Sequence, residues 1–208
     1  TLSDLEYAPI GTNEFAFDGF FNGNDANFIL KLNKMNEDYQ GIFHTLGRNS
    51  VVENLTVSGT VYGKSYVGSV AGRNLGTVKN VSSSVKIIST DGNDIGGIVG
   101  YNEGIISDAI NYEIIDTKGT YVGGIAGENS GEIRNSFNKG RVYGFSNIGG
   151  ITGRNLGTIS NAYNAATVSG DTVIGGIAGE SNGDIIFSYN MGNITATESI
   201  VGGIAGII

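Results

Sequence analysis

The sequence predicts an all-β fold, a single-stranded parallel β-helix (β-solenoid) of about seven coils, each of roughly 26–28 residues. Two observations predict it. A Gly-Gly-Ile-x-Gly phrase recurs with a period of about 27 residues, and the aliphatic residues between the phrases fall into columns free of charge. Such a period is typical of architectures in which each unit stacks on the next. We expect a right-handed coil, because strand–crossover–strand connections almost always have that hand.

The glycine phrase sets the register of the coils. Complete copies begin at Gly96, Gly123, Gly149, Gly175 and Gly202. An earlier copy begins at Gly68 and has Ser69 as its second residue, and a degenerate copy runs from Gly41 to His44. Each interval is long enough for one turn built from about three short strands.

Aliphatic columns predict the interior. The column after the glycine pair contains Val70, Ile98, Ile125, Ile151, Ile177 and Ile204. Three further columns are equally apolar, and the residue after one of them is usually polar, as in a strand with an inner and an outer face. A helical interpretation fails because β-branched residues dominate the columns and glycines interrupt every run.

The two ends of the chain differ from its middle. Residues 1–38 lack the glycine phrase, so we expect irregular first coils that cap the stack, with Lys31 to Asp38 as a polar excursion. Residues 39–208 form the repeats, and the apolar run Ile200–Ile208 ends them. Because the chain begins with Thr1 and ends inside a repeat, we expect it to be a piece of a longer precursor.

Asparagines recur in two columns, which we predict to be a structural ladder of amides bonded along the axis. The first column contains Asn54, Asn80, Asp108, Asn135 and Asn161, and the second contains Asn111, Asn138, Asn164 and Asn190. Asn102, Asn129 and Asn155 stand two residues before Gly104, Gly131 and Gly157, which we interpret as corners with positive φ. Phe137, Tyr163 and Tyr189 share a column and predict a buried aromatic stack.

Composition excludes several classes of protein. Twelve Lys and Arg against 20 Asp and Glu give a net charge of -8, which disfavours nucleic acid and anionic membranes. No apolar run is long enough for a transmembrane helix, so we expect no membrane insertion. The absence of cysteine removes disulfides and thiolate metal sites, and the single histidine, His44, removes a two-histidine zinc site. We predict no cofactor and no bound metal.

Gly97-Ile98-Val99-Gly100, Gly124-Ile125-Ala126-Gly127 and their later equivalents resemble the GLUG motif, and the segment with Pro9-Ile10-Gly11 and Phe17 to Gly23 resembles the prelude to such repeats. This motif is found in tandem in bacterial surface proteins, including adhesins and the non-catalytic part of immunoglobulin-A-specific metallopeptidases. The resemblance implies a secreted or cell-surface location in a bacterium, a binding or spacer role and no catalytic residue of its own. Isoleucine replaces the usual leucine throughout, and His44 replaces the last glycine, where we expect a local bulge.

The leading hypothesis is therefore a non-enzymatic module that serves as a rigid stalk or an adhesive face for a host glycoprotein, a matrix protein or a glycan. Tyrosines that could stack on sugars or anchor a protein are Tyr62, Tyr66, Tyr101, Tyr121 and Tyr143. End-to-end self-association through Ile200–Ile208 is the first alternative.

A carbohydrate-active enzyme is the second alternative, since parallel β-helices can carry clustered carboxylates on an outer face. The candidate acids are Asp91, Asp94, Glu103, Glu128, Glu132 and Asp184. They are sparse and do not accumulate in one column, so we interpret them as solvated surface charge.

Overall fold

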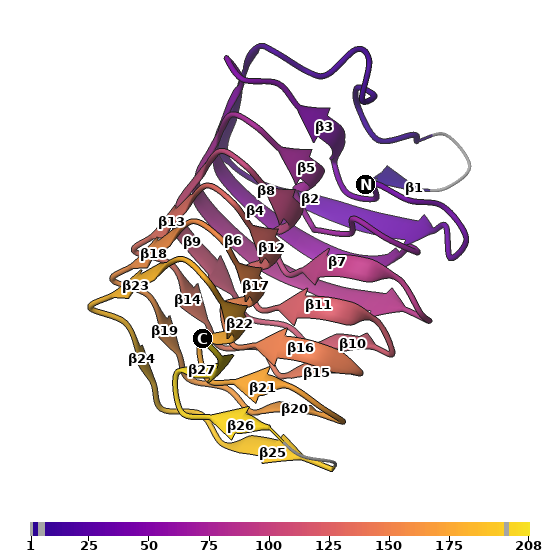
Figure 1. The fold of residues 1–208 in the computed structure, drawn as a ribbon. Coiled ribbons are helices and arrows are strands. Elements are labelled where there is room, and N and C mark those ends of the chain that lie inside the picture. The colour runs from indigo at the N-terminus through magenta and orange to yellow at the C-terminus, as the bar shows by residue number, and fades with distance from the viewer. Residues whose placement is uncertain (1, 4–6, 198–199) are drawn as a thin grey trace.

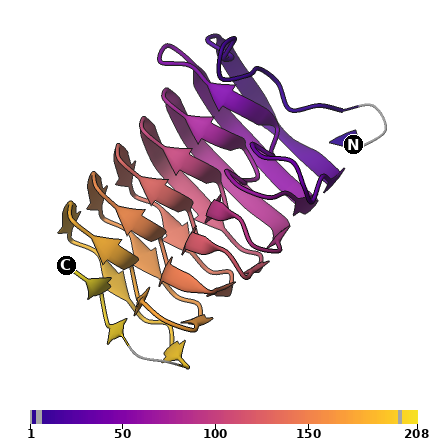
Figure 2. The ribbon, with the colours of Figure 1, turned by 45° about the vertical axis from the view of Figure 1, so that its right-hand side comes forward.

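The computed structural model describes residues 2–3, 7–197 and 200–208, and this part of the chain contains strands and no helix. The strands wind from the N-terminal end to the C-terminal end as a stack of coils (Figure 1). Equivalent strands of successive coils pair in parallel, and they form three sheets, which we name A, B and C. Figure 2 shows the same stack turned, with the coils following one another along a single axis. The predicted β-solenoid of about seven coils is confirmed.

Sheet A is the widest. Its strands are β1 (Leu2–Ser3), β2 (Phe20–Asn33), β4 (Val51–Tyr62), β6 (Thr77–Ser89), β9 (Ile105–Asn111), β10 (Ile115–Thr117), β13 (Glu132–Arg134), β14 (Phe137–Asn138), β15 (Val142–Gly144), β18 (Thr158–Ser160), β19 (Tyr163–Asn164), β20 (Val168–Gly170), β23 (Asp184–Ile186), β24 (Tyr189–Asn190) and β25 (Ile194–Ala196). In the early coils one long strand spans this sheet, whereas later coils divide the same width among two or three strands.

Sheets B and C meet at the glycine phrase. Sheet B contains β3 (Phe43–Leu46), β5 (Ala71–Asn74), β8 (Val99–Asn102), β12 (Ala126–Asn129), β17 (Thr152–Asn155), β22 (Ala178–Ser181) and β27 (Ala205–Ile207). Sheet C contains β7 (Asn93–Gly96), β11 (Thr120–Gly123), β16 (Ser146–Gly149), β21 (Ile174–Gly175) and β26 (Val201–Gly202). From β7 onward the glycine pair of each coil joins a strand of sheet C to a strand of sheet B.

The predicted aliphatic columns fill the interior. The column that follows the glycine pair is fully buried from Val70 to Ile177, and the column that precedes the pair is fully buried from Val67 to Ile174. Strand pairing aligns the columns along the axis, as in the register of Val122 with Ile95 and Ile148. The columns open to solvent only in the last coil, where Ile204 is 40% exposed.

The second glycine of each pair is required by close packing inside the coil. A Cβ atom on Gly124 would lie 2.2 Å from the carbonyl oxygen of Gly150 and 2.3 Å from Cγ of Asn138. Real Cβ atoms do not approach other atoms so closely. One coil has Ser69 in place of this glycine. The same coil has Ser83 at the position that Asn111 occupies in the next coil, so the larger residue at position 69 is accompanied by a smaller residue opposite it.

The first coil is built by residues 10–38 and is closed by aromatic side chains. Ile10 and Phe17 form bridges to Phe43 and Leu46 of sheet B, and β2 pairs with β4 of sheet A. The Phe17 and Phe21 rings both pack on Phe43, with centroids 5.0 and 5.4 Å away.

The polar excursion is shorter than predicted. Lys31, Leu32 and Asn33 belong to β2, and Leu32 is buried in the core. The prediction was wrong for these residues because the alternation of polar and apolar side chains continues through them, so only residues 34–38 leave the sheet.

The second predicted asparagine column is a ladder of buried amides. Asn111 donates to Asn138 at 2.9 Å, Asn138 donates to Asn164 at 2.8 Å, and Asn164 donates to Asn190 at 2.8 Å. Each amide also donates to a main-chain carbonyl two residues later, as Asn138 does to Gly140. This local hydrogen bond takes the place of the regular hydrogen bonding of a strand. The strands of sheet A therefore end at these asparagines in the later coils.

The first predicted column is exposed except for the half-buried Asn54, and it lies within strands β4, β6 and β9 in the early coils and between strands in the later ones. Asn54, Asn80, Asp108, Asn135 and Asn161 have φ between 48° and 56°. Side-chain bonds along this column are fewer, with Asn80 donating to Asn54 at 2.6 Å and Asn135 to Asp108 at 3.3 Å. Asparagine and aspartate suit this column because they tolerate left-handed backbone.

A second buried ladder occupies positions that the sequence suggested only as corners. Asn74, Asn102, Asn129 and Asn155 donate in succession along the axis, and Asn155 reaches Ser181 at 3.1 Å. The glycines two residues later do not have positive φ, so that prediction was wrong. They are needed for space instead, because a Cβ on Gly131 would lie 2.1 Å from the carbonyl oxygen of Gly104.

The aromatic column stacks but is not buried. Phe137 and Tyr163 have ring centroids 4.3 Å apart, and Tyr163 and Tyr189 are 5.3 Å apart. The first two rings are half-buried, and Tyr189 is 50% exposed. The prediction of burial was wrong because the asparagine that follows each ring points inward, which places the ring on the outer face of the same short strand.

Candidate binding surface

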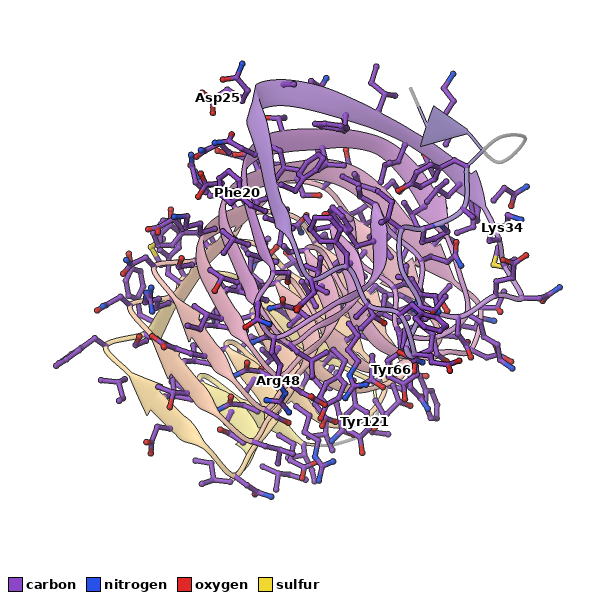
Figure 3. The ribbon with its side chains drawn as sticks, turned by 90° about the horizontal axis from the view of Figure 1, so that it is seen from above. Phe20, Asp25, Lys34, Arg48, Tyr66 and Tyr121 are labelled. Carbon is purple, nitrogen blue, oxygen red and sulfur yellow. The ribbon has the colours of Figure 1, made fainter. Side chains whose placement is uncertain are left out.

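The outer side of the corner between sheets B and C carries a column of residues with left-handed backbone. Each member precedes a residue that pairs along the axis, either in sheet C or in the isolated bridges that continue it, and has φ between 51° and 59°. The members are Tyr39, Tyr66, Asp94, Tyr121 and Asn147. We call this set the left-handed column. Figure 3, which looks down the stack, shows Tyr66 and Tyr121 on one side of the coils, away from Phe20 and Asp25. Left-handed backbone is costly for bulky residues, so three tyrosines in this column are unusual.

Sheet B carries the opposite wall of this corner. Strand register aligns one outward residue from each of five successive coils, and we call this set the charged column. It consists of Arg73, Tyr101, Glu128, Arg154 and Glu180. The two columns therefore face each other along the axis, one rich in tyrosine and the other in charge.

Contacts between the columns run diagonally, from one coil to the next. The Arg154 guanidinium lies 5.5 Å from the centre of the Tyr121 ring, and Asn147 donates to the Glu180 carboxylate at 2.9 Å. The same diagonal step places Asp94 against Glu128, and these two residues line a pocket of about 160 Å³ with Tyr66 and Tyr101. We call it the Asp94 pocket.

Asp94 is the least solvated carboxylate in this pocket. It is 8% exposed, and its Oδ1 atom has no hydrogen-bond donor. Burial, followed by the negative charge of Glu128, raises the pKa of Asp94 from 3.8 to about 7, while Arg154 lowers it. Asp94 is thus not the solvated surface charge that the sequence suggested. That interpretation failed because it compared residues along single columns and not across the corner.

The five predicted tyrosines divide between two regions. Tyr66, Tyr101 and Tyr121 belong to the corner, and burial raises the pKa of Tyr66 and of Tyr101. Tyr62 and Tyr143 share the predicted column but lie at the far edge of sheet A, in separate hollows of about 510 and 330 Å³.

Sequence reasoning missed Tyr39, Arg73 and Arg154. Tyr39 stacks on Tyr66 with ring centroids 4.5 Å apart, and Arg73 lies 5.9 Å from the centre of the Tyr101 ring. The signal was present, because Tyr39 precedes Tyr66, and Arg73 precedes Tyr101, by one period of the repeat. Chemically, the surface combines aromatic faces with carboxylates, amides and guanidinium groups, as surfaces that bind sugars or charged side chains do. Within the described residues, no group of three His, Cys, Asp or Glu could hold a metal ion.

Comparison with known proteins identifies the repeat. Residues 118–143, which span β11 to β14, match the family model of the GLUG motif. This chain carries a GLUG motif. A Gly-rich membrane protein of Evansella cellulosilytica is 36% identical over 84 residues, which are 38% of this chain and 10% of that protein. Halomucin of Haloquadratum walsbyi is 35% identical over 98 residues, 45% of this chain and 1% of that protein.

The chain thus spans a tenth or less of these relatives' own lengths. No solved structure matches it. Among the described residues there is no helix with the length and apolar character needed to cross a membrane.

The last glycine of the GLUG phrase forms the floor of the corner. A Cβ on Gly127 would lie 2.3 Å from the carbonyl carbon of Asp94, and one on Gly153 would lie 2.3 Å from that of Tyr121. The first copy has His44 at this position, and its ring stacks on Tyr39 with centroids 4.4 Å apart. The bulge expected at His44 is absent, since β3 and β5 pair there without a register shift.

Proposed function

We propose that this chain is a non-enzymatic, ligand-presenting module of a secreted or cell-surface bacterial protein. The solenoid is the rigid support, and the corner between sheets B and C is the adhesive face. The names of the two relatives, a Gly-rich membrane protein and halomucin, support the location. The partner would be a host glycoprotein, a matrix protein or a glycan.

The tyrosines of the left-handed column carry this proposal. A bulky residue with positive φ costs on the order of 1 kcal/mol or more, and such strain is concentrated at functional sites. Asn147 occupies the same column with φ of 51° and is better suited to it. A surface with only a spacer role would have no use for Tyr66 and Tyr121 at these positions.

The test compares two matched double variants. Tyr66→Asn with Tyr121→Asn removes two of the aromatic faces of the corner but keeps a residue that accepts left-handed backbone at both positions. Tyr62→Asn with Tyr143→Asn removes two tyrosines from the far edge of sheet A. Binding is measured on immobilised mucin, on collagen and on a glycan array. We expect the first variant to lose binding and the second to retain it; equal binding by both would refute the proposal.

The non-enzymatic part of the proposal has its own test. Asp94, with a raised pKa, and Glu128, paired with Arg154 at 3.6 Å, resemble the acid and the carboxylate of a glycosidase. The protein is therefore incubated with uronic-acid polymers and host glycans, and new reducing ends are measured. We expect none, and release of new ends that stops in the Glu128→Gln variant would establish the enzyme instead.

End-to-end association is the second candidate function, and the last coil favours it. Val201 and Ile204 are at least 40% exposed, although their equivalents in the preceding coil, Ile174 and Ile177, are fully buried. A second copy of this chain could cover the exposed apolar residues of this rung. Light scattering should then show oligomers that grow with concentration and that Ile204→Lys weakens. A monomer at every concentration would exclude the filament.

A further inference from the structure

The pairs that face each other across the corner are chemically matched, except at one coil. Tyr121 faces the Arg154 guanidinium, and Asn147 donates to Glu180. At the coil before these, Asp94 faces Glu128, so two carboxylates meet. The next two coils instead pair an aromatic ring with a cation and an amide with a carboxylate. Two like charges at one site of low solvation are unfavourable unless a cation joins them.

The cations already present in the corner do not balance its carboxylates. Arg73 donates to both carboxylate oxygens of Glu103, at 2.8 and 3.0 Å. Arg154 lies 3.6 Å from Glu128 and 3.6 Å from Glu180, so Glu128 of the pocket shares its charge with a carboxylate outside the pocket. Two guanidinium groups therefore serve four carboxylates along this corner. The Oδ1 atom of one of these carboxylates, that of Asp94, receives no hydrogen bond.

We propose that the Asp94 pocket binds a primary ammonium group, as carried by a lysine side chain or an amino sugar. This inference rests on the proposed function, because it names the chemical group that the adhesive face would recognise. The ammonium would donate to the Asp94 carboxyl group and lie beside Glu128, with the Tyr66 and Tyr101 rings as neighbouring aromatic surfaces.

The chemistry of the pocket selects a primary ammonium over other cations. A primary ammonium has three N–H donors, so it can donate to the Asp94 carboxylate and still interact with Glu128 and the tyrosine rings. A quaternary ammonium has no N–H donor and could not form a hydrogen bond to either carboxylate. A calcium ion needs six to eight oxygen ligands, and two carboxylates supply too few. The volume of about 160 Å³ accommodates the end of a side chain rather than a whole oligosaccharide.

Binding should depend on pH because a cation favours the ionised form of Asp94. The titratable and charged groups that face Asp94 are Glu128, Arg154, Tyr66 and Tyr101. With a pKa of about 7, Asp94 is mostly protonated at pH 6 and mostly ionised at pH 8. Affinity for a lysine ammonium, which stays charged at both pH values, should therefore increase roughly tenfold over this range, with release of a proton from Asp94 on binding.

The experiment is an NMR titration of the ¹⁵N-labelled full chain. The ligands are Nα-acetyl-lysine methylamide and glucosamine, with Nα,Nε-diacetyl-lysine methylamide, tetramethylammonium and calcium chloride as comparisons. We expect the amide signals of Tyr66, Tyr101 and Tyr121 to shift with at least one of the first two ligands and not with the comparisons. Shifts with the lysine derivative alone identify a protein partner, and shifts with glucosamine alone identify a glycan.

Two variants test the role of Asp94 itself. Asp94→Asn keeps a residue that accepts the φ of 59° and should weaken ammonium binding at pH 8 at least tenfold. Asp91→Asn makes the same chemical change at an exposed position three residues earlier and should bind as the unmodified chain does. Equal ammonium binding by both variants, no binding by the unmodified chain, or tighter binding of tetramethylammonium or calcium would overturn the inference.

These results separate the pocket from the adhesive face. If ammonium ligands do not bind but the Tyr66→Asn, Tyr121→Asn variant still loses surface binding, the pocket inference fails and the proposed function stands. If that variant retains surface binding, the proposed function fails whatever the titration shows.

Discussion

Replacing Asp94 with asparagine should stabilise the chain at alkaline pH and change its stability little at acid pH. In the folded state this carboxyl group holds its proton up to about pH 7, whereas in the unfolded chain it ionises near its ordinary pKa of 3.8. Between these two values the folded state binds more protons than the unfolded state. The free energy of unfolding of the unmodified chain therefore falls as pH rises through this window and is constant above it.

The magnitude follows from the width of the window. Each pH unit in which the folded state holds one extra proton costs about 1.4 kcal/mol, so the window from 3.8 to about 7 corresponds to roughly 4 kcal/mol. Asparagine has no charge to bury and accepts the left-handed backbone of this position, so the variant escapes the loss. Glu128 and Arg154 are present in both chains, so the comparison isolates the change at position 94.

Urea denaturation followed by circular dichroism measures this difference. At about pH 4.5 the two chains should differ little, and at about pH 8.5 the variant should be more stable by roughly 3 kcal/mol. Asp91→Asn is the control, because it makes the same chemical change at an exposed position. A stability difference between the Asp94 variant and the unmodified chain that does not change with pH would refute the burial of an unpartnered carboxylate.

Five further variants, two of them controls, test the packing of the coils by urea denaturation. Gly124→Ala should cost about 3 kcal/mol or more because its Cβ would overlap the next coil, whereas Gly203→Ala, with no atom within 4 Å of its Cβ, should cost little. Asn138→Ala should cost about 1–3 kcal/mol by leaving buried amides of the ladder without partners, whereas Asn161→Gly at an exposed left-handed turn should stay within about 0.5 kcal/mol. Tyr163→Ala should cost less than the roughly 3–5 kcal/mol of a buried aromatic residue, since its ring is only half-buried, and a larger loss would contradict the observed stack.

The period of the sequence predicted contacts along the axis but not contacts around the coil. Residues one repeat apart are neighbours in any solenoid, so the Ile98–Ile125–Ile151 column and the Asn111–Asn138 ladder followed from spacing alone. Which columns face each other depends on the angle at the glycine corner, and no spacing reports that angle. The approach of Asp94 to Glu128, which belongs to the following coil, was therefore not predicted.

Local preferences explain which backbone conformations could be predicted. Asparagine tolerates positive φ, so the left-handed backbone of the first asparagine column was readable from residue type. Tyrosine does not share that preference, and the positive φ of Tyr66 and Tyr121 follows from tertiary packing against the last glycine of the phrase. The glycines after the buried asparagines were misread for the converse reason, because glycine serves close approach as well as left-handed backbone.

A solenoid makes departures from repetition informative. Because every coil repeats the same corner, each residue there is compared with equivalents in the same environment, and a difference has to be explained by that coil alone. The corner accepts Tyr121 opposite Arg154 and Asn147 opposite Glu180, so its backbone does not require an acid at position 94. The cost of burying Asp94 beside Glu128 is borne by a single coil, which is the reason for assigning the binding of a cationic group to that coil and not to the repeat as a whole.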